Sequence, residues 1–186
     1  MTRSPSTPRL YLAALGALAA VAAPLAGQEA PADQPTETQL KTADGRDAGT
    51  VTFRQAEHGV LVMAKLKNLT PGPHGFHIHE TGACTPDFKA AGGHYNPAGS
   101  EHGFDGAGGY HVGDMPNIHV GDDGTAMGEF FVPQVSVSGP ENDRYPYTLD
   151  DADGSAIMVH SGGDDYADMA SAGDRVACGV IMPPRS

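Results

Sequence analysis

Positive charge is scarce in this sequence. Its 186 residues include 11 Lys and Arg against 23 Asp and Glu, for a formal net charge of −12. The basic residues form no patch along the chain. Because nucleic acids and anionic lipid surfaces attract proteins through positive charge, this composition argues against both as partners.

Long apolar runs are also scarce, and the chain has one, Leu10–Leu25. It follows Arg3 and Arg9 and contains no charged residue, which is typical of a secretory signal peptide. The run is too short and too rich in alanine for a strong transmembrane helix, although an uncleaved anchor is the alternative. We therefore expect a signal peptide over residues 1–27, export to the periplasm or beyond, and no stable membrane insertion after cleavage.

The remainder is predicted to be one domain behind a short linker. Residues 28–36 are polar and rich in proline, as in a disordered linker. Residues 37–186 are enough for a single domain with its own core. Cleavage of the signal removes two arginines and no acid, which leaves 9 basic against 23 acidic residues and a net charge of −14.

Cysteine is limited to Cys84 and Cys178, and no CxxC redox motif is present. In an exported chain, two cysteines are expected to form a disulfide, with two free buried thiols as the alternative. The pair lies 94 positions apart. Closing so long a loop stabilises a fold by about 4–5 kcal/mol in the chain-entropy model.

Amphipathic helical periodicity is absent, whereas Gly (25) and Pro (15) are abundant. Eight short segments instead show alternating or β-branched character, separated by turn signals such as Asp44-Gly45 and Asp153-Gly154. This pattern predicts an all-β domain, an eight-stranded Greek-key β-sandwich or barrel. The predicted strands are Thr38–Thr42, Thr50–Gln55, Val60–Leu66, Gly75–His79, Ile118–Val120, Thr125–Phe131, Ser155–His160 and Val176–Met182.

Two long segments, Glu80–Pro116 and Ser161–Arg175, interrupt the strand pattern, and each begins directly after a strand that carries histidine. Loops of this length in a compact domain are usually functional. In the stretch GFHIHETGAC, His77 and His79 alternate on one strand and so point to the same face.

Together with the histidines of the first long loop and His160, these two histidines suggest two metal sites. His94, His102, His111 and Asp114 supply three imidazoles and one carboxylate, the set of a closed tetrahedral zinc site. His77, His79 and His160 supply nitrogen alone, which suits copper. The alternative is loose metal binding by an exposed histidine-rich loop. The two outlying histidines, His58 and His119, are expected to be surface residues.

The motifs HGFHIHE, GGHYNP, HVGD, MVH and RVACGVI occur in this order and resemble the signatures of the copper–zinc superoxide dismutase family. The resemblance covers Thr36 to Met182. It implies an enzyme that converts superoxide to O₂ and hydrogen peroxide, with one redox-cycling copper ion and one structural zinc ion per subunit, in antioxidant defence outside the cytoplasm. It also implies that the two long segments are a metal-binding loop and an electrostatic loop.

The resemblance assigns the metal ligands residue by residue. His94 is implied to bridge copper and zinc and to exchange a proton in catalysis. The other implied copper ligands are His77, His79 and His160, and the other implied zinc ligands are His102, His111 and Asp114.

Five further residues match supporting positions of the family. Arg175 matches the arginine that guides the anion to copper. Asp164 matches a carboxylate that links a copper histidine to a zinc histidine, with its neighbour Asp165 as the rival. His74 matches a position that buttresses the copper strand. Cys84 and Cys178 match the disulfide within the subunit.

The chain departs from the familiar enzymes in two segments. Residues 161–174 contain four aspartates and no lysine, so we expect attraction of superoxide to be confined to short range or to be supplied elsewhere, for example by Lys89. The segment from Cys84 to His94 is longer than in eukaryotic forms, where it contributes to the dimer interface. A homodimer is therefore expected only as one option, and its geometry is left open.

Three other classes of function compete with the enzyme. A dismutase-like protein for copper delivery or storage often lacks a copper ligand or the arginine. A copper-only dismutase lacks the zinc ligands. A structural cell-surface sandwich keeps vestigial sites. The presence of every ligand position and of Arg175 disfavours all three.

Overall fold

The computed structural model describes Met1 and residues 34–185. The predicted signal peptide over 1–27 and the predicted linker over 28–36 lie outside the described residues, apart from Met1 and residues 34–36. The first strand begins at Thr36. Among the described residues, no helix is long and apolar enough to cross a membrane.

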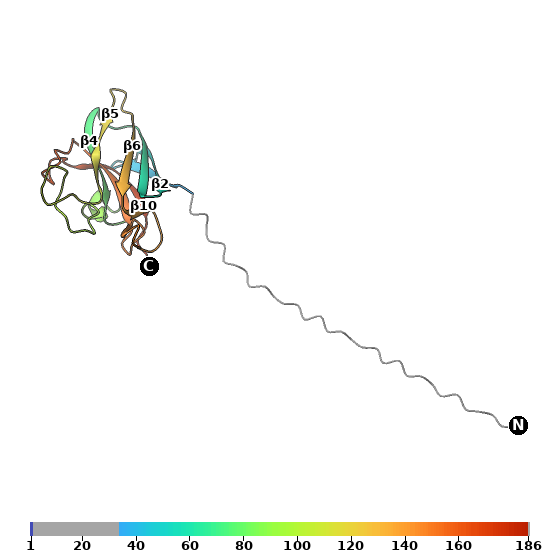
Figure 1. Cartoon of the computed structure of the whole chain (residues 1–186). Coiled ribbons are helices and arrows are strands. Elements are labelled where there is room, and N and C mark those ends of the chain that lie inside the picture. The colour runs from blue at the N-terminus through green and yellow to red at the C-terminus, as the bar shows by residue number, and fades with distance from the viewer. Residues whose placement is uncertain (2–33, 186) are drawn as a thin grey trace. The chain divides into compact units, whose positions relative to one another are not determined.

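The domain is an antiparallel β-barrel that is nearly closed (Figure 1). Its strands follow one another in the order β5-β4-β9-β10-β1-β2-β3-β6, and the two end strands, β5 and β6, contact each other. The connections from β3 to β4 and from β6 to β9 cross over several strands, as in a Greek key. The eight strands are β1 (Thr36–Thr42), β2 (Asp47–Ala56), β3 (Gly59–Leu66), β4 (Gly72–His79), β5 (Asp114–Val120), β6 (Ala126–Pro133), β9 (Ser155–His160) and β10 (Arg175–Met182).

The all-β, eight-stranded prediction is confirmed, and the differences are local. β5 begins at Asp114, four residues before the predicted start, and therefore includes Pro116. Proline cannot donate to a ladder, but β5 is an end strand with an irregular register beside Pro116, where proline is tolerated. Three short elements were not predicted, namely η1 (Phe88–Ala91) and the parallel pair β7 (Val135–Ser136) and β8 (Tyr147–Thr148).

The core is formed by the inward side chains of the alternating strands. In β1, every second residue from Thr38 to Thr42 is buried, and the residues between them are exposed. Burying such side chains stabilises the fold by about 25 cal/mol for each Å² of apolar surface removed from water. The largest fully buried apolar side chains are Leu40, Phe53, Phe76, Ile78, Met115, Ile118, Leu149, Ile157 and Met158.

β4 and β9 are buried on both faces, unlike a strand with one face in water. On β4, Phe76 and Ile78 point into the core, so the alternation places His77 and His79 on the opposite face. On β9, Ile157 and Val159 belong to the core, and His160 follows on the other face. The two long loops cover this outer face, and the histidines lie between the loops and the barrel wall.

Candidate metal centre

A first group of histidines gathers over the outer face of β4 and β9. His77 and His79 come from β4, His160 from the end of β9, and His94 from the first long loop, where it forms an isolated β-bridge with His79. One ring nitrogen from each lies within 4.8 Å of the others, and all four residues are buried. The distances are those of side chains that converge on a single point.

A second group shares His94 with the first. His94, His102, His111 and Asp114 are buried, and one ligand atom of each lies within 4.8 Å of the others. Asp114 is at their centre: its Oδ1 lies 2.7 Å from Nδ1 of His94, and its Oδ2 lies 3.1 Å from Nδ1 of His102. The His94 ring therefore lies between the two groups.

Five buried ring nitrogens in these groups have no hydrogen-bond partner. They are Nδ1 of His77, Nε2 of His79, Nδ1 of His102, Nδ1 of His111 and Nε2 of His160. Buried polar atoms without partners are rare and need an explanation. Nδ1 of His102 is close to Asp114, yet the approach lacks hydrogen-bond geometry, as is expected of two ligands that share a cation.

In most of these rings, the other ring nitrogen forms a hydrogen bond with a protein group. Nε2 of His77 donates to Asp164 at 2.8 Å, Nδ1 of His79 to the carbonyl of Gly92 at 3.1 Å, and Nδ1 of His160 to the carbonyl of Gly173 at 3.3 Å. Metal-binding histidines characteristically donate their other N–H to such acceptors, which fixes ring orientation. The donor set therefore fits two metal ions that share one imidazole.

Burial favours the neutral form of four of these imidazoles, as metal binding requires. It lowers the pKa of His77 and of His111, and it lowers the pKa of His79 well below the ordinary value. For His160, burial lowers the pKa from 6.5 to about 3. At neutral pH these rings therefore carry an unprotonated nitrogen.

Asp114 is ionised although it is buried. Burial raises the pKa of its carboxyl, but hydrogen bonds from the His94 side chain and the Gly103 backbone outweigh this effect and lower the pKa to about 2. Its Oδ2 also accepts the backbone N–H groups of Gly103 at 3.0 Å and His111 at 3.1 Å. The second group thus contains one full negative charge.

Asp164 links the two groups, whereas Asp165 does not. Oδ2 of Asp164 accepts from Nε2 of His77 at 2.8 Å, and its Oδ1 accepts from Nε2 of His102 at 3.2 Å. Asp165 is exposed, and its Oδ1 accepts the backbone N–H groups of Ala167 and Asp168. The geometry therefore favours the first of the two candidate aspartates.

Replacing Asp164 by Asn should weaken zinc binding by about 10- to 100-fold, because the amide cannot accept from both rings and orient them. The dissociation constant can be measured on copper-free protein by competition with a chromophoric chelator. Asp165→Asn is the matched control and should bind zinc as the unchanged chain does. Equal effects of the two substitutions would contradict the linking role.

Arg175, the first residue of β10, pairs with His160 of the first group in the sheet. Its guanidinium donates to the carbonyl of Phe88 and to the carbonyl of Gly92, both at 2.6 Å. The Gly92 carbonyl also accepts from His79, so one backbone oxygen connects the arginine to the metal-binding rings. The arginine is half-buried, and burial lowers its pKa, but it stays a cation at any physiological pH.

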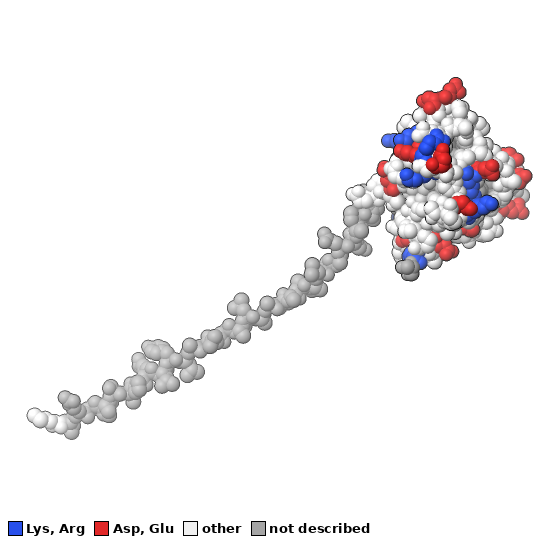
Figure 2. Space-filling view, turned by 180° about the vertical axis from the view of Figure 1, so that it is seen from behind, with Lys and Arg blue, Asp and Glu red and all other residues white. Residues whose placement is uncertain are grey.

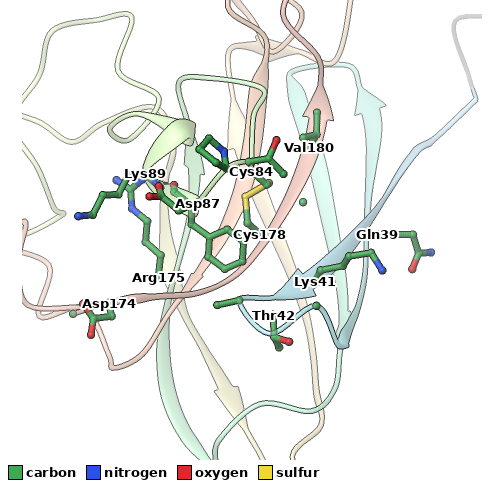
Figure 3. A pocket seen from close by; sticks show the side chains of 17 residues that line it. Gln39, Lys41, Thr42, Cys84, Asp87, Lys89, Asp174, Arg175, Cys178 and Val180 are labelled. Atoms are coloured by element: carbon green, nitrogen blue, oxygen red, sulfur yellow. Dashed lines mark hydrogen bonds between the residues drawn. A yellow bond between two sulfur atoms is a disulfide. The ribbon is translucent and has the colours of Figure 1, made fainter.

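The predicted disulfide is confirmed: Cys84 is bonded to Cys178, with their Cα atoms 5.9 Å apart. Cys84 precedes η1 and Cys178 is in β10, so the bond attaches the first long loop to the barrel. Figure 3 shows it beside Arg175 and Lys89, in an open groove between this loop, β1 and β10. The disulfide therefore connects the loop whose carbonyls bind Arg175 to β10, the strand that contains Arg175.

His74 has both ring nitrogens occupied by backbone carbonyls. Nδ1 lies 2.6 Å from the carbonyl of His160, and Nε2 lies 2.7 Å from the carbonyl of Thr70. No nitrogen of this buried ring faces either group, so it joins β4 to the end of β9. The two other histidines of the chain, His58 and His119, are exposed.

Sequence reasoning missed the residues that hold Asp164 itself. Asn117 of β5 hydrogen-bonds its backbone, and Ser171 donates its hydroxyl to Oδ1 at 3.1 Å. Asn117 lies 47 positions from Asp164. A single asparagine on a strand gives no local sign of such a contact, because the contact exists only after the fold brings the two distant residues together.

Several known proteins are similar to this chain in sequence. A sequence model of the family described as copper/zinc superoxide dismutase (SODC) matches residues 47–181. The chain is 48% identical over 146 residues to a Cu-Zn superoxide dismutase of Caulobacter vibrioides, covering 76% of this chain and 82% of that protein. It is 39% identical over 158 residues to that of Photobacterium leiognathi, covering 78% and 83%.

Solved structures are similar as well. A double mutant of a SOD-like protein from Bacillus subtilis superposes with a TM-score of 0.72 at 36% identity, covering 79% of this chain and 97% of the other. The Cu/Zn superoxide dismutase from Brucella abortus superposes with a TM-score of 0.63 at 31% identity, covering 80% and 99%.

Proposed function

This chain belongs to the copper/zinc superoxide dismutase family, and from that premise we propose which of its residues hold the two metals. The family function is the dismutation of superoxide to O₂ and hydrogen peroxide, and its cofactors are copper and zinc. The observation that supports the assignment is the set of five unpaired, buried imidazole nitrogens directed into two groups that share His94.

We assign copper to the all-nitrogen group and zinc to the group with the carboxylate. Copper suits imidazole nitrogen, whereas three nitrogens and one carboxylate oxygen form the closed set of a structural zinc site. Bound copper supplies one-electron redox chemistry, and zinc supplies none. The proposed copper ligands are Nδ1 of His77, Nε2 of His79, Nε2 of His160 and His94, and the proposed zinc ligands are His94, Nδ1 of His102, Nδ1 of His111 and Asp114.

The surrounding residues orient the ligands and handle charge and protons. Asp164 holds His77 and His102 in one tautomer each. His94 presents Nδ1 to Asp114, which leaves Nε2 on the side of the first group, where it takes up and returns a proton during turnover. Arg175, anchored by two carbonyls, offers its cation to the superoxide anion beside that group. His74 braces the two strands that supply the copper ligands.

Selective ligand removal tests this assignment. His111→Ala should lose zinc and keep copper, since it contributes only to the second group, while His79→Ala should lose copper and keep zinc. Elemental analysis after loading with both metals and dialysis measures the copper and zinc content of each variant. A chain in which His111→Ala loses copper and retains zinc would show that the two sites are assigned the wrong way round.

We further propose that the protein works outside the cytoplasm, in the periplasm or beyond, after loss of residues 1–27. The signal-like sequence and the disulfide support this, because structural disulfides persist in oxidising compartments. We also propose that the protein forms a homodimer. N-terminal sequencing of the exported protein and its mass in solution test the two statements.

Steering of superoxide is proposed to be weak and local. Figure 2 shows Lys and Arg in small groups beside acidic side chains, without a broad basic surface on that face. Three of the four aspartates in residues 161–174 are exposed. The local cations are Arg175 and its neighbour in the groove, Lys89.

Raising the ionic strength from about 0.01 M to about 0.15 M shortens the Debye length from about 30 to about 8 Å. We expect kcat/KM to change by less than about threefold over this range, because a strong steering field accelerates association by about 10-fold or more. Pulse-radiolysis rates at fixed pH give the answer. A steep fall with added salt would show that the field reaches far into solution.

A further inference from the structure

Asp164 can link the two metal sites only if its loop is held at a fixed position against the barrel. Its carboxylate has two ring nitrogens to satisfy, from His77 and His102, at 2.8 and 3.2 Å. A shift of the loop by one ångström would break one contact or both. The residues that fix its backbone therefore control the orientation of a copper ligand and of a zinc ligand together.

Asn117 of β5 holds the backbone of Asp164 at both of its polar groups. Nδ2 of Asn117 donates to the carbonyl of Asp164, and the backbone N–H of Asp164 donates to Oδ1 of Asn117, each at 2.8 Å. The paired bonds reproduce with a side-chain amide what a neighbouring strand does with its backbone. Within residues 34–185, no other barrel residue hydrogen-bonds the backbone of Asp164.

The backbone of Asn117 holds the next part of the same loop. Its N–H donates to the hydroxyl of Tyr166 at 3.0 Å. Tyr166 has φ of 64°, a left-handed conformation that costs a non-glycine residue free energy and persists only where its surroundings impose it. In turn, the N–H of Tyr166 donates to Oδ1 of Asp164 at 2.8 Å. One strand residue thus fixes both ends of the segment 164–166.

We propose that Asn117 is a positioning residue that couples the two metal sites through Asp164. Within residues 34–185, its side chain hydrogen-bonds Asp164 and none of the residues of the two metal groups. β5 also begins with Asp114, the carboxylate of the second group, so a single strand sets one zinc ligand and the loop that orients another. The inference rests on the metal assignment proposed above.

Zinc affinity of copper-free protein tests the inference without relying on enzymatic activity. Asn117→Ala should weaken zinc binding about tenfold, the lower end of what loss of an outer partner costs. Asn142→Ala is the matched control, because its amide also makes several hydrogen bonds with backbone groups, but in an exposed turn over 140–145. It should leave the affinity unchanged.

The decisive comparison repeats Asn117→Ala in a chain that already carries Asp164→Asn. If Asn117 acts through Asp164, the second substitution should cost less than about twofold there, since interacting residues are non-additive. The absorption bands of cobalt(II) placed in the zinc site should shift in Asn117→Ala and not in Asn142→Ala. Should Asn117→Ala fail to fold by circular dichroism, Asn117→Asp keeps the size and the acceptor but not the donor, and the same comparison applies.

A weakening below about threefold, or one of equal size with and without Asp164, would overturn the positioning role. Zinc binding by the unchanged chain distinguishes failure of the metal assignment from failure of the Asn117 proposal. If the unchanged chain binds no zinc, the metal assignment fails and the inference fails with it. If it binds zinc and Asn117→Ala binds equally well, the inference alone fails.

Discussion

His160→Ala should lose more than about 100-fold of the superoxide-consuming activity and its copper, while keeping zinc. Loss of an outer partner of a metal ligand costs about 10- to 100-fold, so loss of a ligand should exceed that range. His160 contributes Nε2 to the first group only, and its ring lies at the end of β9, away from Asp114. Elemental analysis and a superoxide-consumption assay on the same sample measure both effects.

His119→Ala provides the control for His160→Ala. His119 is exposed on β5, two strands from β9, and belongs to neither group. Its replacement should change neither metal content nor rate. Retained turnover in His160→Ala, with copper still bound, would contradict the assignment of this histidine.

Removal of the disulfide should lower the free energy of unfolding by about 4–5 kcal/mol, the chain-entropy value for a loop of this length. The double variant Cys84→Ser, Cys178→Ser keeps similar side-chain size at one half-buried and one buried position. The bond spans a sequence separation of 94 residues, which includes most of the proposed ligands. Urea unfolding of metal-free protein at equilibrium gives the difference from the linear extrapolation.

The unchanged chain under reducing conditions is the internal control, because it should fall to nearly the same stability as the double variant. A loss below about 1 kcal/mol in both would show that the unfolded chain is not appreciably constrained by the bond. Arg175 gives a second readout: it is held by the carbonyls of Phe88 and Gly92 in the loop that the disulfide anchors. Turnover should therefore fall together with stability.

Much of the fold was predictable because the strands obey local rules. All eight predicted segments correspond to strands, since alternation and Gly- and Asp-rich turns act over a few residues. The start of β5 was not predictable, because Pro116 and Asn117 break the alternation and the strand is completed by pairing with β4. The short pair β7 and β8 likewise depends on contacts between distant segments.

The histidines of the site were visible in the sequence for a different reason. Their density in the first long loop and at the ends of the two strands that precede the long loops is a chemical signature that does not depend on local structure. What stayed hidden was the support by backbone and amide groups. The Gly92 carbonyl accepts hydrogen bonds from both His79 and Arg175, and Asn117 donates one to the backbone of Asp164. Neither a glycine nor an asparagine indicates a metal site in a sequence. Only the folded arrangement identifies them.

The competing classes of function differ from the enzyme in identifiable residues. In this chain both groups are complete, and Arg175 is fixed beside the first by two hydrogen bonds. A copper carrier has no need for an anchored arginine or for a closed zinc site.

The most direct test of the account is one preparation of the protein, examined for metal content and for superoxide consumption together. The account predicts one copper and one zinc per chain and rapid catalysed loss of superoxide, with the activity removed by chelation of copper and restored by its return. A chain that binds one copper and one zinc and yet consumes no superoxide would contradict it.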